Sequence, residues 1–252
     1  MRTQKRIGLA RALSKIGYCS RSQAAILIRA GRVARNGRIV RDPKSPVRMP
    51  GGRIGDDRIE VDGSPIGRTP AIYLVMNKPR GVVTTASDER GRETVYDLLE
   101  PGLPWLGPVG RLDKASEGLL LLTNDSEWAA RITDPERHLD KKYHVQVDCV
   151  ADAGLLARIT RGRTVGGEHL RAKGARLLRH GDKNSWLEIT LDEGKNRQIR
   201  RLLEALGVGV LRLVRVSIGP LELGDLNKGV VRRLTLEEKQ AIDRALQAVV
   251  PT

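Results

Sequence analysis

The sequence contains no phenylalanine, and its only aromatic residues are three Trp and four Tyr among 252 residues. A sheet that stacks several bases on aromatic rings, as in the RRM fold, is therefore not expected. Leu, Ile, Val and Ala have to fill the core. A hydrophobic content of 40% is enough to build one, which argues against wholesale disorder.

Cysteine is almost as scarce, with only Cys19 and Cys149, far apart in the sequence. No CxxC pair or Cys/His cluster suggests zinc, and we expect neither a metal nor a cofactor. No hydrophobic run is long enough to span a membrane, and the N-terminal sequence is too basic for a signal peptide. We therefore expect a cytoplasmic protein that does not associate with membranes.

Positive charge is abundant and unevenly distributed. The formal net charge is +15, and residues 1–70 hold 16 Lys and Arg against 5 Asp and Glu, a net charge of +11. Such a segment attracts phosphates without sequence preference, so it favours a polyanion-binding head on a near-neutral body. A solubility device or a membrane-surface patch would be the alternatives, and the second has no amphipathic anchor to support it.

The first 63 residues predict two short helices followed by short strands. Leu9, Leu13 and Ile16 have helical spacing, and Ser20 with Gln23 resembles a capping box that begins a second helix. Asn36-Gly37 between short apolar segments predicts a hairpin. Residues 62–70 contain turn formers without periodicity and are expected to form a linker.

The remaining residues alternate between strand and helix patterns. Residues 71–79 and 118–125 are apolar runs of strand length, and residues 143–149 and 186–191 alternate with a period of two. Further elements are predicted by an apolar helical face before Gly207, a strand over residues 210–218 and a helix capped by Thr235 and Glu238. The body is therefore α+β and rich in sheet.

The N-terminal pattern resembles the S4 RNA-binding domain, a small αL-like fold, over about residues 5–63. The matching residues are Leu9, Leu13, Gly17, Ser20, Arg21, Ala25, Ile28, Gly31, Arg32, Val33, Asn36 and Gly37. We expect Arg21, Arg29 and Arg32 to project from one side and to contact RNA phosphates, because guanidinium groups match phosphate oxygens. The plain alternative is a solvated charged face.

The body resembles the RsuA/RluB/RluE branch of pseudouridine synthases, and the most specific stretch is PVGRLDKASEGLLLLTND, residues 108–125. Four flanking segments occur in the order typical of the family: residues 76–85, 141–147, 193–203 and 215–229. One short motif would be weak evidence, and five in order are strong evidence. Ser116 stands where many members have Thr, and Ser126 where Gly is common.

The resemblance implies that Asp113 is the catalytic carboxylate, acting as a nucleophile or as a base on a flipped-out uridine. It also implies that Arg200 keeps this carboxylate charged and that Tyr143 stacks on the target base. Taken alone, these residues would be read as a turn aspartate, a solvated helix arginine and a core tyrosine. Candidate phosphate contacts around the pocket are Lys78, Arg111, Lys141, Lys195 and Arg197.

We therefore predict an α+β protein with an S4 domain over 1–63, a linker over 64–70 and a mainly antiparallel or mixed-sheet synthase domain over 71–252. It would isomerise uridine in ribosomal RNA, as a monomer. One alternative is a non-catalytic S4-type RNA-binding or ribosome-assembly protein, which would not need the motifs of the body. Another is a glycosidase-like hydrolase with Glu117 as its second carboxylate.

Overall fold

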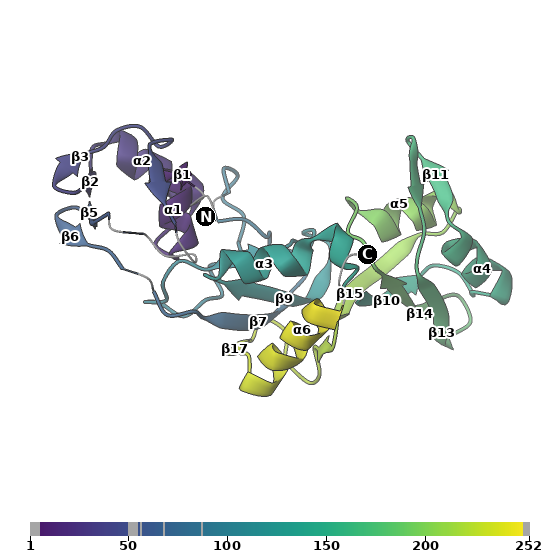
Figure 1. Ribbon diagram of the computed structural model, residues 1–252. Coiled ribbons are helices and arrows are strands. Elements are labelled where there is room, and N and C mark those ends of the chain that lie inside the picture. Colours follow the sequence, from purple (N-terminus) through teal and green to yellow (C-terminus); the bar gives the residue numbers. More distant parts are fainter. Residues whose placement is uncertain (1–5, 50–54, 56, 68, 87, 249–252) are drawn as a thin grey trace. The chain divides into compact units, whose positions relative to one another are not determined.

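The computed structural model describes residues 6–49, 55, 57–67, 69–86 and 88–248, and the chain divides into two compact units (Figure 1). Unit 1 comprises residues 1–73, 100–108 and 122–130, and unit 2 comprises residues 74–99, 109–121 and 131–252. Helices and sheets are both present, so the predicted α+β class is confirmed. The domain boundaries at residues 63 and 71 stay a prediction.

The N-terminal part of unit 1 consists of two short helices and two small sheets. One sheet pairs β1 with β4, and the other has the order β3-β2-β5-β6. Ser20 caps α2 by accepting a hydrogen bond from the backbone N–H of Gln23 at 3.0 Å, as the sequence predicts. The elements are β1 (Arg6–Gly8), α1 (Leu9–Lys15), α2 (Arg21–Arg29), β2 (Val33–Arg35), β3 (Arg38–Ile39), β4 (Pro46–Arg48), β5 (Ile59–Val61) and β6 (Ser64–Pro65).

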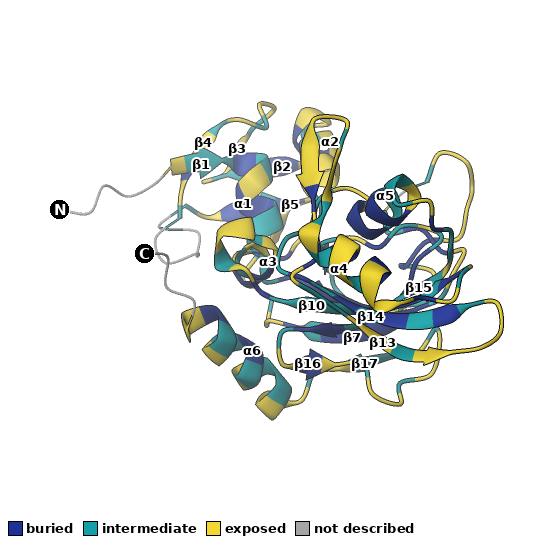
Figure 2. Ribbon diagram, turned by 90° about the vertical axis from the view of Figure 1, so that its right-hand side faces the viewer, coloured by how far each residue is buried: buried dark blue, intermediate teal, exposed yellow. Residues whose placement is uncertain are grey.

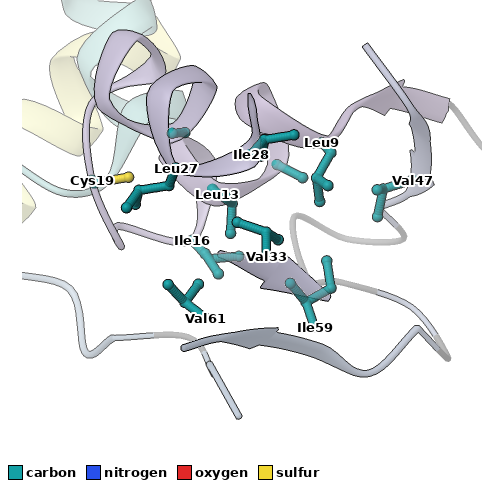
Figure 3. Packing of buried hydrophobic residues seen from close by; sticks show 12 residues of the cluster. Leu9, Leu13, Ile16, Cys19, Leu27, Ile28, Val33, Val47, Ile59 and Val61 are labelled. Atoms are coloured by element: carbon teal, nitrogen blue, oxygen red, sulfur yellow. The ribbon is translucent and has the colours of Figure 1, made fainter. Parts of the chain in front are cut away.

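A single apolar cluster holds these short elements together (Figure 3). Leu13 of α1 and Ile28 of α2 are fully buried, and they pack in a cluster that includes Val33 and Val61 of the sheet. Each strand is only two or three residues long, so this core, rather than the strand ladders, stabilises the fold.

The start of the predicted linker is ordered into a strand. Ser64 pairs with Val61, and Asp62 and Gly63 form the turn between β5 and β6, both with positive φ. A lack of apolar periodicity does not exclude a strand here, because a two-residue strand leaves no pattern in the sequence.

The largest sheet contains nine strands. Its main order is β13-β14-β10-β15-β9-β7-β17, with β16 paired to β15 and β8 paired to β9. β15 pairs with β9 in parallel and with β10 in antiparallel, so the predicted mixed sheet is confirmed. The strands are β7 (Tyr73–Lys78), β8 (Gly107–Val109), β9 (Glu117–Thr123), β10 (Lys141–Val147), β13 (Gly174–His180), β14 (Ser185–Leu191), β15 (Val210–Ile218), β16 (Leu221–Glu222) and β17 (Val231–Arg233).

Burial along the strands follows the sequence patterns (Figure 2). Every residue of β9 is buried, as its continuous apolar run predicts. β14 alternates strictly between buried and half-buried residues, and β10 alternates from Tyr143 onward. One face of these strands is therefore enclosed, and it carries the side chains of the site described below.

The remaining elements are short helices and a two-stranded hairpin. They are α3 (Ser126–Thr133), the 3₁₀ helix η2 (Pro135–Arg137), α4 (Ala153–Arg161), β11 (Arg163–Val165), β12 (Glu168–Leu170), α5 (Gln198–Ala205) and α6 (Leu236–Ala248). Thr235 and Glu238 form the predicted capping box before α6. In the described part of the chain, no helix combines the length and apolar character needed to cross a membrane.

Candidate active site

A cavity of about 330 Å³ lies on the enclosed face of the large sheet, within unit 2. Tyr143 and Lys141 of β10 and Arg215 of β15 belong to its lining, and the loops 109–116 and 193–199 contribute further residues. This volume is at the lower end of the range for small-molecule sites and is compatible with one nucleotide. The cavity brings together the predicted Asp113 and Tyr143.

Asp113 lies in the loop between β8 and β9, and the backbone of this loop is held at several points. The N–H of Ser116 donates to the carbonyl of Asp113 at 2.9 Å, and the hydroxyl of Thr84 donates to the carbonyl of Leu112 at 2.8 Å. The carboxylate itself retains 37% of its side-chain exposure. The loop is therefore fixed through its main chain, which leaves the acidic group available at the cavity.

Lys78 is part of this support, and its burial argues against the predicted phosphate contact. Its side chain is fully buried, and its ammonium donates to the carbonyls of Pro79, Asp113 and Ser116 at 2.9, 3.3 and 2.9 Å. Burial lowers the pKa of Lys78 to about 8. A phosphate cannot reach this group without displacing the loop that carries Asp113.

The cation nearest to the carboxylate also differs from the expected one. The ion pair of Asp113 in the structure is with Arg197, Nη1 to Oδ2 at 3.6 Å, whereas Arg200 donates from Nη2 to the carbonyl of Ala115 at 2.9 Å. Arg197 precedes α5 in a left-handed conformation, φ 47° and ψ 34°, which turns it away from the helical direction of Arg200. Arg200 therefore holds the loop, and Arg197 faces the acid.

Arg200 remains close enough to act electrostatically. Burial lowers the pKa of its guanidinium, the neighbouring Arg197 lowers it further, and Asp113 opposes both effects. The side chain lines a second cavity of about 360 Å³ that it shares with Arg197, and its buried Nε has no hydrogen-bond partner in the described part of the chain. The two arginines thus form one cationic wall beside Asp113.

Tyr143 lies on the buried face of β10 with 9% of its surface exposed. It is paired across the ladders with Ile189 of β14 and Arg215 of β15, so its ring direction is set by strands on both sides. An aromatic ring on this floor can stack on a planar base that enters the cavity.

Three other predicted phosphate contacts, Arg111, Lys141 and Lys195, line the same cavity, as does Arg197. Arg111 and Arg197 are exposed. Lys195 forms an ion pair with Glu193 at 2.9 Å and donates to the carbonyl of His169 at 3.0 Å.

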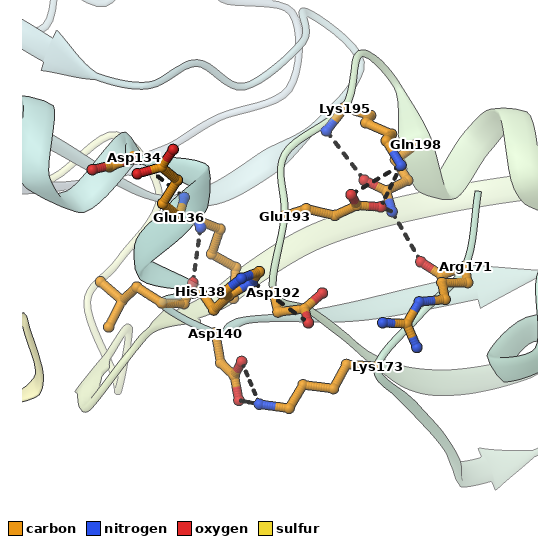
Figure 4. A network of polar contacts seen from close by, with 12 residues as sticks. Asp134, Glu136, His138, Asp140, Arg171, Lys173, Asp192, Glu193, Lys195 and Gln198 are labelled. Atoms are coloured by element: carbon orange, nitrogen blue, oxygen red, sulfur yellow. Dashed lines mark hydrogen bonds and ion pairs between the residues drawn. The ribbon is translucent and has the colours of Figure 1, made fainter. Parts of the chain in front are cut away.

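Gln198, which the sequence did not single out, organises this corner of the cavity (Figure 4). Its side chain is buried, and Nε2 donates to Glu193 at 2.6 Å and to the carbonyl of Arg171 at 2.9 Å. Its Oε1 accepts the N–H of Lys195 at 3.1 Å. The loop before α5 is therefore held by a side chain that looked like an ordinary helix residue.

The three arginines predicted for the S4 fold do not share one helical face. Arg21 and Arg29 are the first and last residues of α2, and both are exposed. Arg32 lies beyond the helix, and it pairs with Asp62 through Nε at 2.8 Å and Nη2 at 2.5 Å. The helical geometry that grouped Arg32 with the other two ends at Ala30. Arg21 and Arg29 therefore stay predicted phosphate contacts, and Arg32 is engaged by Asp62.

Glu117 does not have the environment of a second catalytic acid. It is buried and forms ion pairs with Arg212 at 3.1 Å and Lys228 at 2.7 Å. Burial alone would raise the pKa of Glu117, but the two cations prevail and lower it. A doubly paired carboxylate with a lowered pKa is a poor proton donor, which argues against the glycosidase-like alternative.

Comparisons with known proteins identify the family of the chain. The family model described as RNA pseudouridylate synthase matches residues 72–205, and the S4 domain model matches residues 7–54. The ribosomal large subunit pseudouridine synthase B of Bacillus subtilis is 37% identical over 94% of this chain and 96% of its own length. An uncharacterized RNA pseudouridine synthase of Aquifex aeolicus is 37% identical over 93% of this chain and 92% of its own.

The fold agrees as well. A crystal structure of a pseudouridylate synthase superposes with a TM-score of 0.65 at 30% identity, covering 94% of this chain and 99% of the other. The resemblances predicted from the sequence for the N-terminal region and for the body are therefore both confirmed. The chain belongs to the RNA pseudouridylate synthase family and carries an S4 domain in its N-terminal region.

Proposed function

We propose that this protein converts uridine in ribosomal RNA to pseudouridine and that Asp113 is its catalytic carboxylate. The observation that carries the proposal is that Asp113, Tyr143 and the guanidinium of Arg197 meet at one cavity of nucleotide size. Ribosomal RNA is proposed as the substrate because the Bacillus subtilis relative is named for the large ribosomal subunit. The net charge of +15 is consistent with a polyanionic substrate.

The reaction requires a base that is accessible on all sides. The N1–C1′ bond of uridine has to break, the ring has to turn, and a C5–C1′ bond has to form. A base inside a stack cannot do this, so the nucleotide would be flipped into the cavity. The ring of Tyr143 would then stack on the base, while Asp113 at the edge of the cavity would approach the sugar or the ring.

Asp113 would act as an anion, either as a nucleophile or as the base that begins glycal formation. Arg197 would be the cation beside this anion, because its guanidinium lies 3.6 Å from the carboxylate. Arg200 would assist by fixing the carbonyl of Ala115 in the same loop. The role of Arg200 rests on its position behind the loop rather than on a contact with substrate.

RNA would be held at two places in the chain. At the cavity, the exposed Arg111 and Arg197 and the half-buried Lys195 would contact phosphates near the flipped nucleotide. In the S4 domain, Arg21 and Arg29 would contact the backbone of a structured RNA segment. We also propose that the protein is a cytoplasmic monomer.

The test is to map pseudouridine in ribosomal RNA from cells that contain the wild-type protein, Asp113→Asn or Asp182→Asn. Asp182 is an exposed turn residue and serves as the matched control. We expect Asp113→Asn to lose one or more pseudouridines, while purified protein keeps its thermal stability and its RNA affinity. An Asp113→Asn protein that still modifies RNA would exclude this carboxylate. Unchanged ribosomal RNA in the complete absence of the protein would exclude the substrate.

A further inference from the structure

Two cations from neighbouring strands line the floor of the cavity. Lys141 is on β10 and Arg215 on the neighbouring β15, and both side chains line the cavity together with Tyr143. Arg215 is only 5% exposed. A guanidinium and an ammonium on the enclosed face of a sheet are unusual, because burial disfavours charge unless a partner offsets the cost.

Neither cation forms an ion pair with a carboxylate in the described part of the chain. The ammonium of Lys141 donates to the carbonyl of Leu139 at 2.8 Å. Of the two acids near it, Asp140 pairs with Lys173 at 2.8 Å, and Asp192 lies 3.9 Å from the ring of His138 (Figure 4). Burial lowers the pKa of Lys141, and the nearby guanidinium of Arg215 lowers it further, while the two acids oppose this.

Arg215 has a hydrogen-bonding group without a partner. Its Nε donates to the carbonyl of Leu119 at 2.7 Å, which anchors the side chain against β9. Its Nη2 is buried and makes no hydrogen bond with any described residue. An unpaired buried donor needs an acceptor. Because Arg215 belongs to the lining of the cavity, a molecule that fills the cavity can supply this acceptor once the guanidinium turns toward it.

The part of a nucleotide that reaches this floor is the base. A flipped nucleotide stays joined to the RNA by its two phosphates, so these remain at the opening, where Arg111 and Arg197 are exposed. The pyrimidine ring is the only part free to extend inward, beside Tyr143. Its acceptors are the carbonyl oxygens O2 and O4.

We propose that Lys141 and Arg215 form a cationic floor that binds a carbonyl oxygen of the flipped uracil and stabilises the negative charge which the ring acquires during the reaction. The inference deepens the proposed function and rests on it. It assigns Lys141 to the base rather than to a phosphate, and it gives Arg215 a role that the sequence did not suggest.

The charge arises from the bond that breaks. When N1–C1′ cleaves, its electron pair stays on the uracil ring, and the resulting anion shares its charge between O2 and O4. The electron deficiency left at C1′ is relieved in one of two ways. Either the carboxylate of Asp113 forms a bond to C1′, or the sugar loses a proton to this carboxylate. C5 then forms the new bond to C1′ as the bond to Asp113 breaks or, on the other route, as Asp113 returns its proton to the sugar. C5 loses its proton and N1 gains one, so Asp113 is regenerated and the overall change is an isomerisation. Cations placed where charge develops lower the barrier of such a step.

The floor also suits the rotation of the ring. Turning uracil about the axis through N3 and C6 exchanges N1 with C5 and, at the same time, O2 with O4. A carbonyl oxygen therefore occupies the same place before and after the turn. One pair of donors on Lys141 and Arg215 can serve both orientations, which an amino group at C4, as in cytosine, would not permit.

The first experiment compares Lys141→Met with Lys142→Met in the full-length protein. Lys142 is the next residue of β10 and is not part of the cavity lining, so it serves as the matched control. We expect Lys141→Met to lower the single-turnover rate by at least about tenfold, with RNA affinity within about threefold of wild type. Equal rates for the two variants, or a loss of affinity as large as the loss of rate, would overturn the proposal.

The second experiment uses pH to test whether the ammonium supplies the charge. Lys141 is charged only below its lowered pKa, so the wild-type rate is expected to fall as the pH rises through that value. Lys141→Arg keeps its positive charge to higher pH, so its rate should fall at a higher pH than that of the wild type. Identical alkaline profiles would contradict the proposal.

Arg215→Lys provides a third variant, and its folding is checked by thermal unfolding because Nε anchors the strand. A folded Arg215→Lys protein should lose rate more than affinity, as Lys141→Met does, and full activity would overturn the role of Arg215. The experiments distinguish an error in the role proposed for Lys141 and Arg215 from an error in the proposed function. If wild type modifies RNA and Asp113→Asn does not, a fully active Lys141→Met protein refutes the floor alone.

Discussion

The guanidinium of Arg197 lies 3.6 Å from the carboxylate of Asp113, and the residue that supplies it has a positive φ of 47°. For a residue with a Cβ, this left-handed conformation costs about 1 kcal/mol relative to a helical one. The strain is located at the residue that faces the acid, between the loop 193–196 and the first turn of α5. A strained backbone at a catalytic site is a common way to aim a side chain.

This geometry predicts the relative stability of two variants that lack the guanidinium. Arg197→Gly should be as stable as Arg197→Ala or more stable, by up to about 1 kcal/mol, because glycine adopts positive φ without strain. The catalytic rate should fall by the same factor in both variants, since both leave Asp113 without the guanidinium of Arg197. Urea unfolding and single-turnover assays measure the two effects, and an alanine variant more stable than the glycine variant would contradict the backbone conformation.

The buried ammonium of Lys78 predicts a loss of stability rather than of RNA binding. Lys78→Met leaves three carbonyls without their donor, among them those of Asp113 and Ser116, and should destabilise the fold by about 3 kcal/mol. Lys114→Met, at an exposed position of the same loop, should change stability by less than about 0.5 kcal/mol. Denaturant titration measures both.

The salt dependence of RNA binding distinguishes a structural role of Lys78 from the phosphate contact predicted from the sequence. A phosphate ligand contributes to the slope of affinity against salt concentration, and a structural lysine does not. Lys78→Met should therefore bind RNA with the wild-type slope, in conditions where it is folded. A smaller slope would restore Lys78 as a phosphate contact.

Glu117 predicts a pH dependence of stability. Its carboxylate is only 3% exposed, and although burial raises its pKa, Arg212 and Lys228 lower it below the ordinary value of 4.5. A lowered folded-state pKa means that the stabilisation is present above pH 4.5 and is lost as the pH falls through the folded-state value. Glu117→Gln should therefore be less stable than wild type by about 3 kcal/mol at pH 7.

The difference between the two proteins should shrink below about pH 4.5, where wild-type Glu117 becomes protonated and resembles the glutamine. Thermal unfolding over pH 3–7 measures it. A constant difference across this range would mean that the ion pairs with Arg212 and Lys228 do not stabilise the fold through charge.

The S4 domain predicts a change in the salt dependence of RNA binding. Replacing Arg21 and Arg29 by Gln should reduce the slope of log affinity against log salt by about 1.4 to 1.8 if each contacts one phosphate. Arg244→Gln, at an exposed position of α6, removes a charge elsewhere and should leave the slope within about 0.3. Filter binding at several salt concentrations distinguishes them, and equal slopes would remove α2 from the RNA interface.

The features that the sequence predicted well depend on neighbouring residues. β15 has the predicted bounds, residues 210–218, because an apolar strand and its turns are local patterns. The caps at Ser20 and Thr235 were likewise visible, since a cap joins residues three apart. The five motif segments and their order are also read from the sequence alone, and they identified the family without knowledge of the fold.

The features that the sequence did not reveal depend on long-range packing. Lys78 looked like an exposed lysine at a strand end, and its burial follows from carbonyls 35 and 38 residues away. Arg197 and Arg200 belong to one motif, and only the left-handed turn before α5 decides which one faces Asp113. Arg215 carried a signal that could have been used, because an arginine at an inward position of an alternating strand is conspicuous.

Gly118 provides the most direct test of how the cavity is assembled. It lies on β9 opposite Arg215 of β15, where the two strands pair in parallel, and its φ is 101°. A Cβ at this position would lie 2.3 Å from the carbonyl oxygen and 2.8 Å from the nitrogen of Arg215, both rigid backbone atoms. Only glycine allows the strands to approach this closely.

Gly118→Ala should therefore destabilise the protein by at least about 3 kcal/mol, since it combines a steric overlap with a strained φ. Gly181→Ala is the matched control, because a Cβ there meets no atom within 4 Å, and it should change stability by less than about 1 kcal/mol. Urea unfolding of both variants measures the difference. Because Arg215 would move with its strand, any Gly118→Ala protein that remains folded should also modify RNA more slowly. A Gly118→Ala variant with wild-type stability and activity would mean that β9 and β15 lie further apart, and that the floor carrying Arg215 is not built as described.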